Sequence, residues 1–127
     1  MANNLTNYLE NKLLDHFLGT ASYTMPTDVY VGLFTVTPGE AGGGTEVTGG
    51  SYARQTATFT SASSGATSND ANIDFTGMPS ATVVAIGIFD NITSGNMLLY
   101  GSLTTNKTTD AGDTLRIATG DLDISID

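Results

Sequence analysis

The sequence predicts a mainly β protein, a single-domain β-sandwich of jelly-roll-like type with one N-terminal α-helix. Two patterns point to this class: one segment near the start repeats apolar residues at helical spacing, and seven segments after Pro26 follow a period of two. Only 13% of the residues are charged, fifteen are Gly, and Thr, Ser and Asn are frequent, which favours turn-rich β structure over helices. Because 127 residues suffice for one well-packed domain but not two, we assign residues 1–127 to a single domain.

The helix is expected at about residues 4–18. An apolar residue recurs every four positions, and two neighbours widen the stripe: Leu5, Leu9, Leu13 and Phe17, with Tyr8 and Leu14. Asn3 or Asn4 is suited to cap the start, and Gly19 is suited to end the helix. A helix of three to four turns follows, and its apolar face needs a partner.

The sandwich is expected over about residues 27–127. Its strands are short runs rich in β-branched and aromatic residues, separated by Gly, Asn, Asp and Ser. The seven predicted strands are 29–35, 52–60, 72–75, 82–90, 97–105, 113–119 and 122–126. Short strands at this spacing are typical of a sandwich rather than of alternating βαβ units.

The connections carry turn signals of their own. "NITSGN" (Asn91 to Asn96) predicts a short hairpin loop in which Gly95 adopts a positive φ, so the flanking strands should be antiparallel neighbours. The Gly-rich segment 37–50 and the Ser-rich segment 61–70 are predicted to be surface loops.

The stretch "VVAIGIFDN" (Val83 to Asn91) is apolar on both faces. Alternation places Val84, Ile86 and Ile88 on one face and Val83, Ala85 and Phe89 on the other, so neither face suits solvent. By contrast, the strand at 52–60 places Arg54 and three Thr on one side and behaves like a half-exposed strand.

A second apolar sheet face must be covered by the helix, by a loop or by another subunit, and one short helix covers only part of a sheet. We therefore expect a homo-oligomer. The residues expected at its interface are apolar and come from two strands and the helix: Val84, Ile86, Ile88, Leu98, Tyr100, Leu5, Leu9, Leu13 and Phe17.

Charge and composition exclude several classes of function. Thirteen acidic and four basic residues give a formal charge of −9, which is unsuited to binding the phosphates of nucleic acid. Cysteine is absent, which removes disulfides, thiolate catalysis and Cys-ligated metal. The N-terminus has neither the basic nor the apolar region of a signal peptide, and apolar runs are too short to span a membrane, so we expect a chain made in the cytoplasm without a membrane partner.

Single chemically active residues give weak signals. His16 is the only histidine and lacks the Ser, Cys or second His that would complete a nucleophilic site. The run "GEAGGGTE" lacks the Lys and Ser/Thr of a phosphate-binding loop. We interpret the first as a packed or surface histidine and the second as a flexible loop.

Paired carboxylates are the stronger alternative for a site. Asp110 with Asp113, or the alternating Asp121, Asp123 and Asp127, could hold Ca²⁺ or serve in glycoside hydrolysis. Neither set matches the calcium-binding loop motif, and acids on an outward strand face more often prevent edge-to-edge association. We expect no catalytic residues, no metal and no cofactor.

Three blocks of sequence resemble a known family. They are "GGSYARQ", "GIFD" with "LLYGSLTT", and "AGDTLRIATGDL", and the resemblance extends over nearly the whole chain. The family consists of small structural proteins of tailed bacteriophages, often described as tail-fibre or minor tail proteins and similar to capsid cement or decoration proteins. The resemblance implies a jelly-roll-type sandwich with an N-terminal helix, homotrimers, no catalytic residues and a place on the virion.

Two virion roles follow from the resemblance. Because the chain has no repetitive shaft, the sequence favours a cement role, in which a trimer on the outer capsid binds the major capsid protein and stabilises contacts between capsomers. The alternative is a small tail-fibre or tail-tip protein that contacts other tail proteins and takes part in host attachment. A carbohydrate-binding module is a third class, and the sequence offers no exposed aromatic platform for it.

Overall fold

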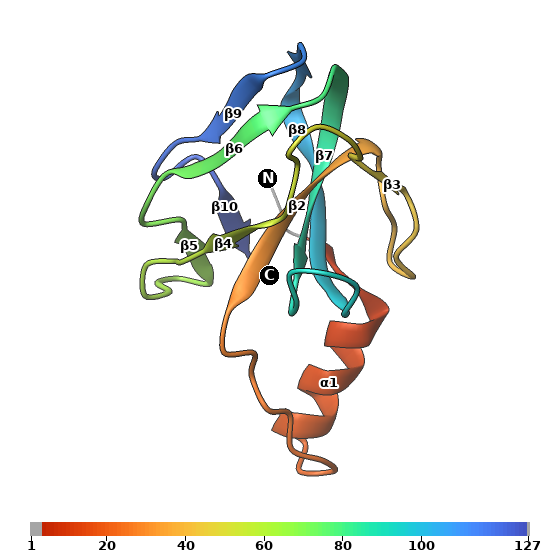
Figure 1. The fold of residues 1–127 in the computed structure, drawn as a ribbon. Coiled ribbons are helices and arrows are strands. Elements are labelled where there is room, and N and C mark those ends of the chain that lie inside the picture. Colours follow the sequence, from red (N-terminus) through yellow and green to blue (C-terminus); the bar gives the residue numbers. More distant parts are fainter. Residues whose placement is uncertain (1–3, 127) are drawn as a thin grey trace.

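The computed structural model describes residues 4–126, which form one helix and ten strands in two facing layers (Figure 1). In chain order the elements are β1 (Asn4–Leu5), α1 (Asn7–Phe17), β2 (Val29–Val36), β3 (Thr45–Glu46), β4 (Gln55–Ala57), β5 (Ala66–Ser68), β6 (Ile73–Met78), β7 (Ala81–Phe89), β8 (Met97–Thr109), β9 (Asp113–Ile117) and β10 (Asp123–Ser125). The predicted mainly β class with one N-terminal helix is confirmed, and the jelly-roll connectivity stays a prediction.

The larger layer is a six-stranded antiparallel sheet. Its order is β1-β8-β7-β2-β3, and β4 pairs with the same edge of β2 as β3 does. The predicted β7–β8 hairpin is confirmed, with Gly95 at a φ of 71°. A side chain is excluded there, because a Cβ on Gly95 would lie 2.6 Å from Asp90 Oδ1.

Two two-stranded ribbons, β6–β9 and β5–β10, face this sheet. The main core lies between the layers and combines residues from both halves of the chain: Val31, Leu33, Val47, Ala57, Ile73, Phe75, Met78, Val83, Ile86, Ile88, Leu115, Ile117 and Leu122. This arrangement explains why the apolar side chains of the ribbons alternate with polar ones, since each ribbon has solvent on its outer face.

The two faces of β7 differ from simple alternation. The register between β7 and β8 shifts between Val83 and Ala85, and this irregularity places Val83 in the main core beside Ile86 and Ile88. Val84 instead packs with Ala85 and Phe89 on the opposite face. The expectation that Val84 shares a face with Ile86 and Ile88 is therefore wrong, because a bulge restarts the alternation.

Helix α1 is shorter than predicted and is capped by a different residue. Thr6 is the N-cap, and its hydroxyl accepts a hydrogen bond from the Leu9 N–H at 3.4 Å. Asn4 belongs to β1 and pairs with Tyr100 of β8, while Asn3 lies outside the described residues. The helix begins at the edge of the large sheet and runs past its end, so that Leu9 is its one buried residue (Figure 1).

Three strands were not predicted. β1 falls inside the expected helix, and β3 and β5 fall inside the segments expected to be loops. These strands have only two or three residues, too few for an alternating pattern to appear. The predicted strand 52–60 is reduced to β4, and Arg54 lies just before it.

Candidate functional site

The face of the large sheet that points away from the main core carries a small aromatic cluster. Phe34 of β2 and Phe89 of β7 stack with ring centroids 6.1 Å apart, and Val84, Ala85 and Met97 pack against them. Gly87 makes this packing possible, because a Cβ there would lie 3.0 Å from the Phe34 ring. Since Phe34 and Phe89 are buried within one chain, this part of the second face is covered without a partner.

Arg54 covers the aromatic cluster from outside. Its guanidinium carbon lies 3.5 Å from the centroid of the Phe89 ring, a cation–π contact. The same group donates two hydrogen bonds to the Glu46 carboxylate, at 3.0 and 2.9 Å, and two more to the carbonyl oxygens of Asn91 and Ser94. The Arg54 side chain is only 9% exposed, so the prediction that it lies on a half-exposed face is wrong.

Tyr52 joins the aromatic face to the main core. Its ring stacks on Phe75 with centroids 6.1 Å apart, while its hydroxyl donates to Glu46 Oε2 at 2.7 Å and accepts from the Leu33 N–H at 2.9 Å. The hydroxyl thus accepts the hydrogen bond of a backbone N–H of β2, at a position between the part of β2 that pairs with β3 and the part that pairs with β4. Burial and the hydrogen bond to Glu46 raise the pKa of Tyr52 well above its ordinary value.

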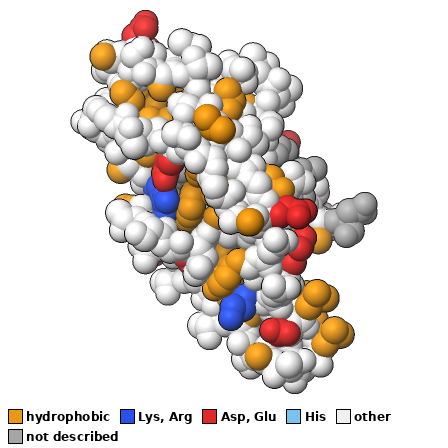
Figure 2. Space-filling view, turned by 90° about the vertical axis from the view of Figure 1, so that its right-hand side faces the viewer, with side chains coloured by type: hydrophobic (Ala, Val, Ile, Leu, Met, Phe, Trp, Pro, Cys, Tyr) orange, Lys and Arg blue, Asp and Glu red, His pale blue; other side chains and the backbone are white. Residues whose placement is uncertain are grey.

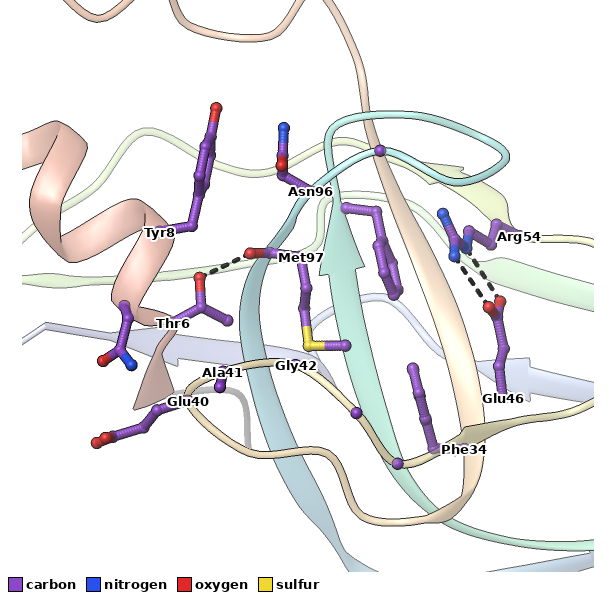
Figure 3. A pocket seen from close by; sticks show the side chains of 15 residues that line it. Thr6, Tyr8, Phe34, Glu40, Ala41, Gly42, Glu46, Arg54, Asn96 and Met97 are labelled. Atoms are coloured by element: carbon purple, nitrogen blue, oxygen red, sulfur yellow. Dashed lines mark hydrogen bonds and ion pairs between the residues drawn. The ribbon is translucent and has the colours of Figure 1, made fainter.

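A pocket of about 600 Å³ lies beside this cluster (Figure 3). Its floor includes Phe34, Phe89 and Met97, and its rim is formed by the start of α1, the Gly-rich loop and the β7–β8 turn. The loop is held by a hydrogen bond from the Asn7 N–H to the Glu40 carbonyl at 2.9 Å. The Gly-rich segment therefore packs against the helix start.

Two of the polar groups that line the pocket are already hydrogen-bonded within the chain. Thr6 donates its hydroxyl to the carbonyl of Met97 at 2.6 Å, and the Glu46 carboxylate is paired with Arg54. Glu40, Asn96 and Tyr8 remain at the rim (Figure 3). The pocket therefore combines an apolar floor with polar side chains at its rim.

A second feature is the exposed end of the helix. Leu14, Phe17 and Leu18 are 58%, 73% and 77% exposed, and Met25 in the following segment is 80% exposed. Hydrophobic side chains are visible at this end of the molecule in Figure 2. A cluster of large apolar side chains in solvent is characteristic of an interaction surface.

The residues predicted at an interface are distributed over three environments. Ile86 and Ile88 lie in the main core, and Leu98 and Leu9 are also buried. Val84, Tyr100, Leu5 and Leu13 are half-buried, while Phe17 is exposed. The interface stays a prediction, and Phe17 is the member of the set that offers most surface to a partner.

The other candidate residues have structural partners. His16 is exposed, and its Nδ1 accepts a hydrogen bond from the Tyr23 N–H at 3.2 Å. Asp113 accepts from the Asp110 N–H at 2.8 Å within a turn, whereas Asp127 lies outside the described residues. Over residues 4–126, His, Cys, Asp and Glu form no cluster of three or more that could hold a metal ion, and the helix is too short to cross a membrane.

Sequence reasoning did not predict the contacts that organise this side of the molecule: it did not single out Glu46 or Tyr52, and it placed Arg54 on a half-exposed face. The signal was present in the blocks "GTEV" and "GGSYARQ", the second of which is among the most specific of the resemblance.

Comparison with known proteins identifies the family. The sequence profile of podophage GP4 fiber I protein gp80 matches residues 4–125, which is nearly all of the chain. The chain belongs to this family. The resemblance to phage structural proteins is thus confirmed, and the gp80 family supports a role as a virion structural component. A search of curated proteins finds no match.

Proposed function

We propose that the protein is a fibre subunit of a phage tail, assembled as a homotrimer and contributing to host attachment. The observation that carries this proposal is the match of the fiber I profile to residues 4–125, which includes the aromatic face, the pocket and the helix. The family description supports the fibre role over the cement role. We also propose that the role is structural rather than catalytic.

The shape of the molecule is consistent with a component of a larger appendage. A compact sandwich carries a helix that runs out from one end (Figure 1). Large apolar side chains in the last turn of this helix are exposed. Such a chain has one end suited to assembly and another, formed by polar ribbons, suited to remain in solvent.

The number of copies per virion distinguishes a fibre from a capsid cement. We expect a handful to a few tens of copies in purified particles, measured by quantitative mass spectrometry against the major capsid protein. Antibodies against the protein should label the tail in electron micrographs and slow adsorption to the host. Hundreds of copies with label over the capsid would refute the fibre role and support the cement alternative.

A further inference from the structure

A second cavity, of about 310 Å³, continues the pocket that lies beside the aromatic cluster. It is bounded by the segment after α1, which contributes Tyr23, and by the β7–β8 turn, and it shares Tyr8, Gly95 and Asn96 with the first pocket. Because the same side chains line both, the two cavities adjoin. We call the two together the tyrosine groove, after Tyr8, which lines both parts, and Tyr23, which lines the second.

The walls of the tyrosine groove are held in place by hydrogen bonds within the chain. At the start of α1, the Thr6 hydroxyl donates to a carbonyl of β8, and the Asn7 N–H donates to a carbonyl of the Gly-rich loop. In the β7–β8 turn, the Asp90 carboxylate accepts from the backbone N–H and the side-chain amide of Asn96, at 2.7 and 3.0 Å. Arg54 donates to two carbonyl oxygens of the same turn. A ligand would therefore enter a groove that is already formed, which lowers the entropic cost of binding.

The fold brings two tyrosines from different segments to this groove. Tyr8 lies in the first turn of α1, Tyr23 lies in the segment after the helix, and both are half-buried. Burial raises the pKa of Tyr23, and the proximity of Tyr8 and Asp90 raises it further. Since Phe34 and Phe89 are buried, the aromatic surface that a ligand can reach comes from the tyrosine rings. The sequence offered no aromatic platform because these two residues are joined only by the fold.

The charges around the groove favour a neutral ligand. Among the described residues that line the two cavities, Glu40, Glu46 and Asp90 carry carboxylates, and Arg54 carries a guanidinium. Arg54 is paired with Glu46, so the groove offers an anion no free cationic partner. Asp90 already accepts two hydrogen bonds from Asn96, and over residues 4–126 no three acidic or histidine side chains gather as a metal ion would require.

The polar groups of the groove are suited to bind hydroxyl groups. A tyrosine hydroxyl donates one hydrogen bond and also accepts, and each carboxylate oxygen of Asp90 can accept a second bond. The Asn96 amide gives one hydrogen to Asp90 and has a second hydrogen and a carbonyl oxygen besides. The side chains of Tyr8 and Asn96 point the same way at the rim (Figure 3). A sugar ring requires the same combination, a flat apolar surface for its C–H face and a border of groups that both donate and accept.

We propose that the tyrosine groove binds a neutral saccharide, with a sugar ring against Tyr8 and Tyr23 and sugar hydroxyls hydrogen-bonded to Asn96 and Asp90. The volume of the first cavity, about 600 Å³, is within the range of roughly 300–1,000 Å³ for sites of small molecules. The inference rests on the host attachment in the proposed function, and it adds the chemical class of the molecule that is recognised.

A printed array of bacterial surface oligosaccharides, both neutral and acidic, tests the inference with the purified chain. We expect binding to neutral members, weakened roughly 10-fold or more by Tyr8→Ala and by Asn96→Ala, the loss of one ring contact or hydrogen bond set. Phe17→Ala, an exposed aromatic on the same helix, and Asn106→Ala, an exposed amide of β8, are the matched controls and should bind as the wild-type chain does. Urea denaturation of all four variants verifies that they fold.

Nuclear magnetic resonance on the isotope-labelled wild-type chain provides a measurement without any substitution. Methyl glycosides of neutral hexoses, added at increasing concentration, should shift the backbone amide signals of Tyr8, Gly95 and Asn96. The amide signals of Gly112 and Gly120, which lie in the turns before and after β9, should not move.

The outcomes separate this inference from the proposed function. Absence of binding to every neutral saccharide, or equal weakening by Tyr8→Ala and Phe17→Ala, overturns the inference. Preference for acidic saccharides, or for a lysine-rich peptide used as a cationic probe, also overturns it, because the groove would then select for charge. None of these results alters the fibre role, which copy number and label position on the virion decide. Label over the capsid would refute the fibre role, and saccharide binding by the isolated chain could still be measured.

Discussion

Replacing Arg54 by Ala should destabilise the fold more than its position beside a short strand suggests. The substitution removes the pair of hydrogen bonds to Glu46, the bonds to two carbonyl oxygens of the β7–β8 turn, and the contact with the Phe89 ring. The Glu46 carboxylate, whose side chain is 25% exposed, then keeps the hydrogen bond from the Tyr52 hydroxyl but loses both hydrogen bonds from Arg54.

The expected loss is about 3 kcal/mol. Breaking a buried ion pair costs about 3–5 kcal/mol, and we take the low end because Glu46 keeps the Tyr52 hydrogen bond and some solvent. For a chain of this length the midpoint of thermal unfolding should fall by roughly 10 °C. Arg54→Lys should retain the charge but lose the planar contact and the paired hydrogen bonds, so its loss should be intermediate.

Urea denaturation at a fixed protein concentration measures the change, and Arg116→Ala is the matched control. Arg116 makes the same two-point contact with Asp74, at 2.7 and 3.0 Å, but its side chain is 57% exposed, so we expect no measurable loss. Equal midpoints for the two variants would show that Arg54 does not hold the aromatic face, and would refute the reasoning.

Further predictions concern single residues. Asn69→Ala should lower the free energy of unfolding in urea by about 3 kcal/mol, because this buried side chain donates to Ala71 and Ala118 and accepts from Gly120 and Leu122. Gly87→Ala should cost about 1–3 kcal/mol in the same assay, since Phe34, Phe89 and Met97 must shift to admit a Cβ. Burial raises the pKa of both Tyr23 and Tyr52, and the hydrogen bond to Glu46 adds to the shift of Tyr52; in a spectrophotometric titration the tyrosine that ionises last should therefore disappear in Tyr52→Phe. The hydrogen bond from Arg116 lowers the pKa of Asp74 below its ordinary value; the contribution of this exposed pair is too small to measure in urea, is present above the ordinary pKa and is lost as pH falls through the lowered one. Carbon-detected NMR should show the Asp74 pKa returning toward its ordinary value in Arg116→Ala.

The sequence was sufficient for the long elements and insufficient for the short ones. β2, β7 and β8 contain enough residues for a period of two to be visible, and their predicted extents agree with the structure within a few residues. β3 and β5 have two and three residues, and they pair because a neighbouring strand presents free backbone groups rather than because of their own composition. Local pattern carries no information about such pairings.

The faces of the sheet were harder to predict than its strands. A single irregularity between Val83 and Ala85 exchanges the sides on which β7 residues point, and period-two reasoning has no means to detect it. The same limit applies to Arg54: a charged residue between polar neighbours is ordinarily placed in solvent, and only the position of Phe89 and Glu46 in space shows that it is buried.

Two apolar surfaces lie outside the main core, the aromatic face of the large sheet and the exposed end of α1, and the chain covers them to different extents. On the sheet, the Arg54 guanidinium lies over the Phe89 ring and is paired with Glu46, so the ring is buried within the chain. On the helix, Phe17 and Leu18 are 73% and 77% exposed. Burial drives association only where apolar area is still exposed and charge does not oppose approach. The helix end leaves large apolar side chains exposed and the aromatic face does not, so a partner would gain more apolar burial at the helix end than on the sheet.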